Sequence, residues 1–176
     1  MRSTKENSII PKPQIARPLE GTFSLTDETL ILYSPEAQSV GAYLAGLLRP
    51  STSYPFPLQE LTETTATNAI ILSLSTAANQ SAEEYKLAVT PENIQISAPT
   101  TQGLFYGVQS LRQLLPPEIE MDKPAEGVDW IVPAIAIEDT PRFEWRGLHL
   151  DVGRHFFPVP FIKKFIDLLA LHKYNI

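Results

Sequence analysis

The sequence contains no cysteine, and this absence excludes several kinds of site at once. Without a thiol there is no disulfide framework, no thiolate metal site and no cysteine nucleophile. Histidine is scarce as well, with three in the chain, and no grouping of histidine with acidic residues suggests a metal site. We therefore expect neither a metal ion nor a cofactor.

Long apolar runs and clustered positive charge are also missing. No segment approaches the ~20 consecutive apolar residues that span a membrane, and the opening MRSTKENSIIPKPQ lacks the apolar stretch of a signal peptide. We expect either a cytoplasmic protein or one from which a signal has been removed. The net charge of −6, with its scattered lysines and arginines, argues against nucleic acid as a partner.

The composition is that of a folded globular protein, with 43% hydrophobic and 19% charged residues. A length of 176 residues suggests one domain with an appendage. Sixteen prolines divide the chain into short periodic segments. These segments are the basis for predicting secondary structure.

Two amphipathic helices are expected before residue 140. The first covers residues 35–48, and Arg49-Pro50 supply its stop signal. The second lies in TTQGLFYGVQSLRQLLPPE, where Pro116-Pro117 end it and apolar side chains share one face: Leu104, Val108, Leu111 and Leu115. Gly103 and Gly107, four residues apart, indicate that this helix packs closely on a sheet.

Strand-like segments surround these helices. They are two short pieces within residues 23–33, a buried run at 68–75, a hairpin of 85–89 with 93–97, and a last strand at 131–137. Pro133 implies an edge position or a bulge in that last strand. An open sheet with two helices on one face accounts for this order, so we predict an α+β domain over residues 1–140.

Residues 141–176 follow a different pattern. GLHLDV alternates apolar and polar residues like a strand, Gly153-Arg154-His155 form a turn, and residues 160–174 have helical spacing. This is one β/α unit, after which Asn175-Ile176 lead toward a second parallel strand. Active sites of parallel α/β folds gather where strands end, but each polar residue here also has a structural interpretation. Arg154 can be solvated or ion-paired, and Asp151 can cap the loop or the helix.

The segment PRFEWRGLHLDVGRHFFPVPFIKKFIDLLALHKYNI resembles the opening of the catalytic barrel of glycoside hydrolase family 20, the β-N-acetylhexosaminidases. The matching positions are Trp145-Arg146-Gly147, Asp151, Arg154-His155-Phe156 and Lys173-Tyr174-Asn175. The chain departs at Gly153, where the family usually has serine, and glycine should loosen the turn. Upstream, IIPKPQ and GLFYGVQSLRQLL resemble the family's non-catalytic α+β domain, so the resemblance covers most of the chain.

The resemblance implies that Arg154 binds hydroxyls of a terminal N-acetylglucosamine or N-acetylgalactosamine, and that Asp151 and His155 support its loop. Catalysis in the family is substrate-assisted and retaining, with an adjacent Asp-Glu pair farther along the barrel. Since a full barrel needs ~250 residues, residues 141–176 are expected to be the truncated start of one, with no catalytic residue in this chain. The expected protein is an inactive N-terminal fragment of a periplasmic or secreted glycosidase.

Two alternatives remain open at this stage. The chain could be a stand-alone carbohydrate-binding or interaction module, although the apolar stripe of residues 160–174 should then cause self-association or disorder of the tail. Similar accessory domains also precede the barrels of hyaluronidase-like N-acetylglucosaminidases and α-glucuronidases. The D-x-x-R-H-F segment favours family 20 over these.

Overall fold

The computed structural model describes residues 9–62, 66–75 and 81–176. The chain forms two compact units, Met1–Thr140 and Pro141–Ile176, and each is considered by itself. In the part of the chain that is described, no helix is long and apolar enough to cross a membrane.

The described residues of the first unit form one seven-stranded sheet in the order β1-β7-β5-β6-β4-β2-β3. β1, β5, β6 and β7 pair antiparallel, whereas β4 pairs parallel to β6, and β2 pairs parallel to both β4 and β3. The strand bounds are β1 Ile15–Ser24, β2 Leu30–Tyr33, β3 Leu58–Glu60, β4 Ala69–Leu74, β5 Tyr85–Val89, β6 Asn93–Ala98 and β7 Ile131–Asp139.

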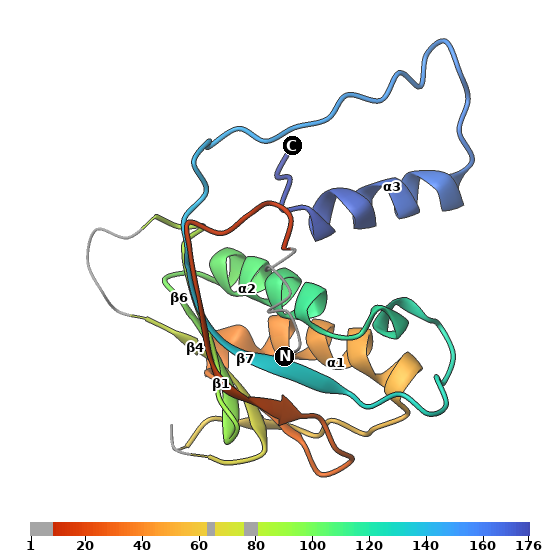
Figure 1. Ribbon diagram of the computed structural model, residues 1–176. Helices are drawn as coiled ribbons and strands as arrows, with labels where there is room; N and C mark the ends of the chain where they lie inside the picture. Colours follow the sequence, from red (N-terminus) through yellow and green to blue (C-terminus); the bar gives the residue numbers. More distant parts are fainter. Residues whose placement is uncertain (1–8, 63–65, 76–80) are drawn as a thin grey trace, which may run out of the picture. The chain divides into compact units, whose positions relative to one another are not determined.

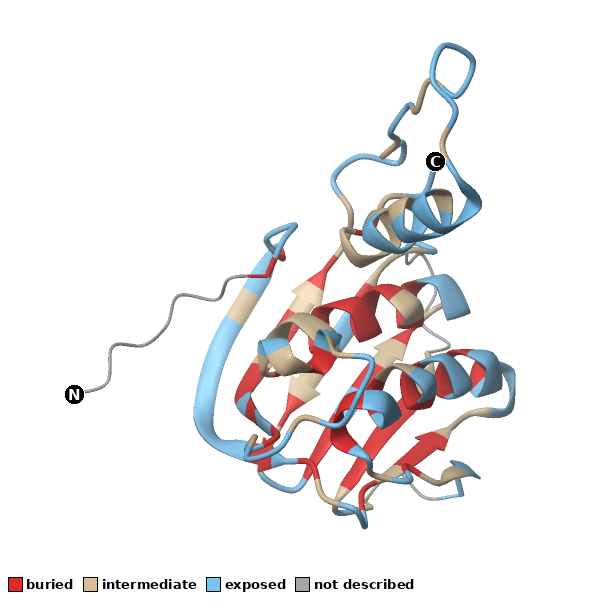
Figure 2. Cartoon of the chain, turned by 90° about the vertical axis from the view of Figure 1, so that its right-hand side faces the viewer, coloured by how far each residue is buried: buried red, intermediate tan, exposed pale blue. Residues whose placement is uncertain are grey.

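Two helices, α1 (Gln38–Thr52) and α2 (Thr101–Leu114), lie side by side on one face of this sheet (Figure 1). Short 3-10 turns precede α1 at Pro35–Ala37 and follow α2 at Pro117–Glu120. Buried residues, red in Figure 2, lie in the strands of the sheet and in α1 and α2. The predicted α+β fold, an open sheet with two helices on one face, is confirmed.

The end of α1 differs from the prediction, because the helix continues through Pro50 to Thr52. Proline removes one hydrogen bond to the carbonyl of Gly46, and Gly46 is exposed, so water can bind that carbonyl instead. The hydroxyl of Thr52 donates to Leu48 O at 2.8 Å, and Ser53 caps the helix in the left-handed conformation. The proline is thus tolerated inside the last turn.

The predicted second helix is confirmed, and its two glycines pack against the sheet as expected. Thr100 caps α2 by accepting a hydrogen bond from Gly103 N at 3.2 Å. A Cβ at Gly103 would lie 2.8 Å from Ala98 Cβ and would also collide with the backbone oxygen of Glu84. A Cβ at Gly107 would collide with Ile96. Both positions therefore require glycine for the helix to approach this closely.

β7 is an interior strand between β1 and β5, so Pro133 does not mark an edge. The other alternative is observed, because the β1–β7 register shifts between Pro18 and Thr22, opposite the part of β7 that contains Pro133. This bulge includes Gly21, whose φ is +97°. Residues 15–22 of β1 and the whole of β3 were not predicted as strands.

In the second unit, residues 147–152 form no regular strand, although the predicted helix is present as α3, Val159–Leu171. The start of a parallel ladder is nevertheless visible. Ile176 N donates to Arg146 O at 3.3 Å, and Leu148 N donates to Ile176 O at 3.1 Å, which is the parallel pattern around Gly147. The predicted strand has one bridge of a ladder and no further partner among the described residues.

Candidate functional site

The turn Asp151–His155 is organised by the carboxylate of Asp151. Its Oδ1 accepts hydrogen bonds from the backbone N–H groups of Gly153 and Arg154, both at 3.0 Å. An aspartate that binds the backbone two and three residues ahead is a common means of fixing a tight turn. The loop-capping interpretation of Asp151 therefore holds in the structure.

The second oxygen of the same carboxylate contacts the Arg154 side chain. Nε of Arg154 lies 2.9 Å from Oδ2 of Asp151, while the Arg154 side chain is 93% exposed and that of Asp151 42% exposed. An ion pair in this much water contributes little to stability, about 0–1 kcal/mol. The contact fixes an orientation more than it holds the fold together.

His155 is linked to the following helix through a series of aromatic rings. Its ring centroid lies 5.0 Å from that of Phe157, which stacks on Phe161 at 4.6 Å. Phe165 continues the series at 6.4 Å from Phe161. The turn is therefore held by Asp151 before Arg154 and by packing onto α3 after it.

The opposite end of this unit is closed by Arg146 and Asn175. Asn175 Oδ1 accepts from Arg146 N at 3.0 Å, and its Nδ2 donates to Glu144 O at 2.7 Å. Arg146 Nε donates to the carbonyl of Lys173 at 2.8 Å. Sequence reasoning named these residues as motif matches without assigning them a task. The structure shows that they join the two ends of the β/α unit.

Large apolar side chains of the second unit are exposed to solvent. No residue of α3 is buried, and Figure 2 shows the helix without the buried face that α1 and α2 have. An exposed apolar surface of this kind marks an interaction face. The exposed residues are Phe143, Trp145, Leu148, Val152, Phe156, Val159, Phe161, Ile166, Leu168 and Ile176.

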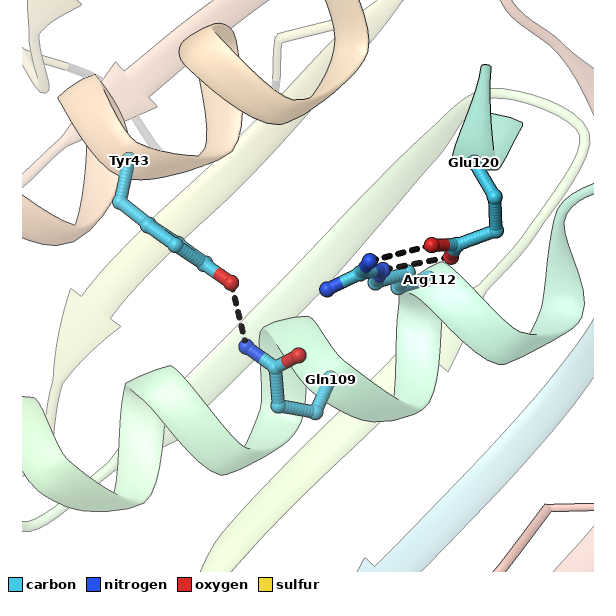
Figure 3. A network of polar contacts seen from close by, with 4 residues as sticks. All are labelled: Tyr43, Gln109, Arg112 and Glu120. Carbon is cyan, nitrogen blue, oxygen red and sulfur yellow. Dashed lines mark hydrogen bonds and ion pairs between the residues drawn. The ribbon is translucent and has the colours of Figure 1, made fainter. Parts of the chain in front are cut away.

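Polar side chains of α1, α2 and the 3-10 turn Pro117–Glu120 contact one another. Between α1 and α2, Gln109 donates to the Tyr43 hydroxyl at 3.2 Å, and Arg112 makes a two-pronged contact with Glu120 (Figure 3). The hydrogen bonds that Arg112 donates to the Glu120 carboxylate raise the pKa of Arg112. Among the described residues, Gln109 Oε1 is buried without a partner. This network connects α1, α2 and the 3-10 turn Pro117–Glu120.

A second buried network joins β5, α2 and β7. The Tyr85 hydroxyl donates to Asp139 Oδ2 at 3.0 Å and shares a hydrogen bond of 2.7 Å with Ser110. Burial, together with the nearby Asp139 carboxylate, raises the pKa of Tyr85. Asp139 Oδ1 also accepts from Gln14 N at 3.2 Å. These contacts are structural, because each group is satisfied within the unit.

The described residues contain no group of three or more histidine, aspartate or glutamate side chains that could hold a metal ion. Arg154, Asp151 and His155 come together in one turn. The Arg154 guanidinium is more exposed than the Asp151 carboxylate with which it pairs. What the turn can do chemically is present a planar cation with several N–H donors to a ligand rich in oxygen.

Comparison with known proteins gives the same two-part division. The family model described as "Glycosyl hydrolase family 20, domain 2" matches residues 6–140, and "Glycosyl hydrolase family 20, catalytic domain" matches residues 143–176. A β-hexosaminidase of Porphyromonas gingivalis is 36% identical over 96% of this chain and 22% of its own length. A β-N-acetylhexosaminidase of Cellulomonas fimi is 35% identical over 96% of this chain and 33% of its own length.

Among solved structures, an N-acetyl-β-hexosaminidase of Streptomyces plicatus is similar, with a TM-score of 0.86 and 42% identity. That alignment covers 96% of this chain and 33% of the Streptomyces chain. The chain thus spans about a third or less of the length of these relatives. The match extends from the accessory α+β domain into the start of the barrel.

Proposed function

The chain belongs to glycosyl hydrolase family 20, and we propose on this basis that it is the amino-terminal part of a β-N-acetylhexosaminidase. The whole protein would remove terminal N-acetylglucosamine or N-acetylgalactosamine residues from glycans. Support comes from relatives that are named β-hexosaminidases and that match both units of the chain. The single observation that carries the proposal is the catalytic-domain match over the turn that exposes Arg154.

In this proposal Arg154 binds the sugar. The guanidinium is flat and rigid and carries five N–H donors, so two of them can reach two adjacent hydroxyls in fixed geometry. Lysine, a point charge on a flexible stem, would hold the sugar ring less firmly. Asp151 and His155 support the turn through the contacts described above.

The chemistry that we propose for the whole protein is substrate-assisted and retains the anomeric configuration. The acetamido oxygen of the bound sugar attacks the anomeric carbon, an aspartate orients the acetamido group, and a glutamate protonates the departing oxygen. We assign this adjacent Asp-Glu pair to barrel units after α3. The 176-residue chain by itself should therefore be inactive.

The test compares the whole gene product with the 176-residue chain on a nitrophenyl N-acetyl-β-glucosaminide. Release of nitrophenol by the whole protein and none by the short chain is expected. The variant Arg154→Ala in the whole protein should lower kcat/KM by roughly 100-fold or more, the size of losing a bidentate contact. Turnover by the purified short chain, or an inert whole protein, would contradict the proposal.

The exposed apolar residues of the second unit also bear on the alternative of a stand-alone module. An unfinished β/α unit with this surface should associate with itself in solution. Sedimentation of the 176-residue chain is expected to show concentration-dependent oligomers. A compact monomer that binds N-acetylhexosamine without cleaving it would favour the stand-alone module instead.

A further inference from the structure

We propose that Asp151 is a positioning residue for Arg154, so that one carboxylate sets both the backbone and the side chain of the sugar-binding arginine. The inference rests on the proposed function, in which Arg154 contacts the sugar. It goes further by stating which edge of the guanidinium is presented and which residue fixes that edge.

The two oxygens of Asp151 have separate tasks. Oδ1 accepts from the N–H groups of Gly153 and Arg154, which fixes where the arginine leaves the backbone. Oδ2 lies 2.9 Å from Arg154 Nε, which fixes where the side chain goes next. A cap of the turn alone would require only the first set of contacts. The second contact is made to the functional side chain itself.

The contact through Nε determines the edge that remains for a ligand. A guanidinium can bind through Nε and one terminal nitrogen, or through its two terminal nitrogens. With Nε held by Asp151, the pair of terminal nitrogens is the edge left for a bidentate contact with two adjacent hydroxyls. A side chain that is 93% exposed has no packing to hold it, so the ion pair is what limits its rotation.

Residue 153 lies directly against this carboxylate. A Cβ built on Gly153 would be 3.5 Å from Asp151 Oδ1, an ordinary contact distance. The carboxylate therefore covers the turn on the side of residue 153, and a serine there would meet no obstacle. Because glycine at position 153 has no side chain to contact the turn, the hydrogen bonds of Asp151 hold residues 151–154 in place.

Asp151→Asn in the whole protein separates the two tasks. Asparagine keeps one oxygen that can accept from the backbone N–H groups, but it presents an amide N–H₂ to Nε of Arg154. Because both of these groups are donors, the contact between the two side chains is lost. We expect KM to rise roughly tenfold with kcat nearly unchanged, as for the loss of a contact that a supporting residue had oriented. The melting temperature should stay that of the wild type. Asp167→Asn on the exposed side of α3 is the matched control and should change neither.

The double variant decides how Asp151 acts. If it works through Arg154, Asp151→Asn should have no further effect in the Arg154→Ala background. An equal loss in both backgrounds would overturn the proposal, as would wild-type KM for Asp151→Asn. If instead Arg154→Ala leaves kcat/KM unchanged, the proposed sugar-binding role of Arg154 is wrong. That outcome differs from the two results above, which contradict the positioning role of Asp151.

A measurement without any variant guards against a misfolded Asp151→Asn protein. In the NMR spectrum of the unmodified whole protein, the Nε–H of Arg154 should resonate apart from those of the other arginines. A signal at the position of a free arginine would overturn the inference.

Discussion

Replacing Gly103 by alanine should destabilise the first unit, even though alanine is the better helix former. A Cβ at this position would lie 2.8 Å from Ala98 Cβ and would collide with the backbone oxygen of Glu84. Carbon atoms pack at about 3.5–4.0 Å, so α2 would have to move away from the sheet by roughly 1 Å. The backbone oxygens of Glu84 and Ala82, in the segment before β5, cannot rotate aside as a side chain can.

The magnitude follows from two opposing effects. Overpacking of this kind costs about 1–3 kcal/mol, with a rigid obstacle at the upper end. The gain in helix propensity from glycine to alanine is about 1 kcal/mol. A net loss of about 2 kcal/mol should lower the melting temperature of a unit of this size by roughly 4–8 °C.

Gly46 provides the matched control on α1. It is exposed, and a Cβ there would meet nothing within 4 Å. Gly46→Ala should therefore show the propensity gain alone and raise the melting temperature by roughly 2–4 °C. Circular dichroism and the fluorescence of Trp130, which is 4% exposed, follow unfolding of the first unit. Equal stabilisation by Gly103→Ala and Gly46→Ala would refute the reasoning.

Three further predictions concern the networks and the turn. The pKa of Tyr85 is raised above its usual 10.0, so above pH 10 the unfolded chain loses a proton that the folded unit keeps. Stability should then fall by up to ~1.4 kcal/mol per pH unit, and Tyr85→Phe should remove this slope in alkaline urea titrations. Asn175→Ala removes the hydrogen bonds to Arg146 N and Glu144 O. Hydrogen exchange at the Arg146 amide should then become about fivefold faster or more. An unchanged exchange rate would show that Asn175 does not hold the two ends of the β/α unit together. Gly153→Ser should stabilise the folded turn by about 0.4–1 kcal/mol, because serine has fewer backbone conformations in the unfolded chain. Proteolysis at the turn should then be slower, and faster cleavage would contradict this prediction.

The helices and the central strands could be predicted from sequence because their signals are local. Leu104, Val108, Leu111 and Leu115 repeat at helical spacing, and all four are buried in the structure. The hairpin of β5 and β6 was equally plain, since its turn is set by Thr90 within a few residues. Gly103 and Gly107 could be read as packing positions because nothing else explains two glycines on the inner face of a helix.

Features that depend on distant parts of the chain were missed. β1 reads as extended chain with prolines, and only its pairing with β7 more than a hundred residues later makes it a strand. β3 has three residues, too few for a periodic signal. The stop at Pro50 was wrong because the environment of Gly46, not the proline itself, decides whether the last turn survives.

At the candidate site, the sequence named Asp151, Arg154 and His155 but not the contacts between them. Asp151 was considered as a cap and Arg154 as an ion-paired or solvated residue, and the structure shows that the cap and the ion pair are one arrangement. The residues 147–152 have the alternation of a strand, but a parallel strand needs neighbours, and here it has a single bridge to Ile176. Alternation in sequence specifies which face is apolar; it does not supply the partner.

The bulge in β1 has a consequence for the behaviour of the protein at high concentration. β1 is ten residues long and lies at an edge of the sheet, where a regular strand would invite another chain to add to it. Pro18 has no N–H to donate to an added strand, and the bulge between Pro18 and Thr22, which contains Gly21, interrupts the regular pairing geometry. The other edge, β3, is too short to recruit a strand. Both edges of the sheet are therefore protected against the addition of a strand from another chain.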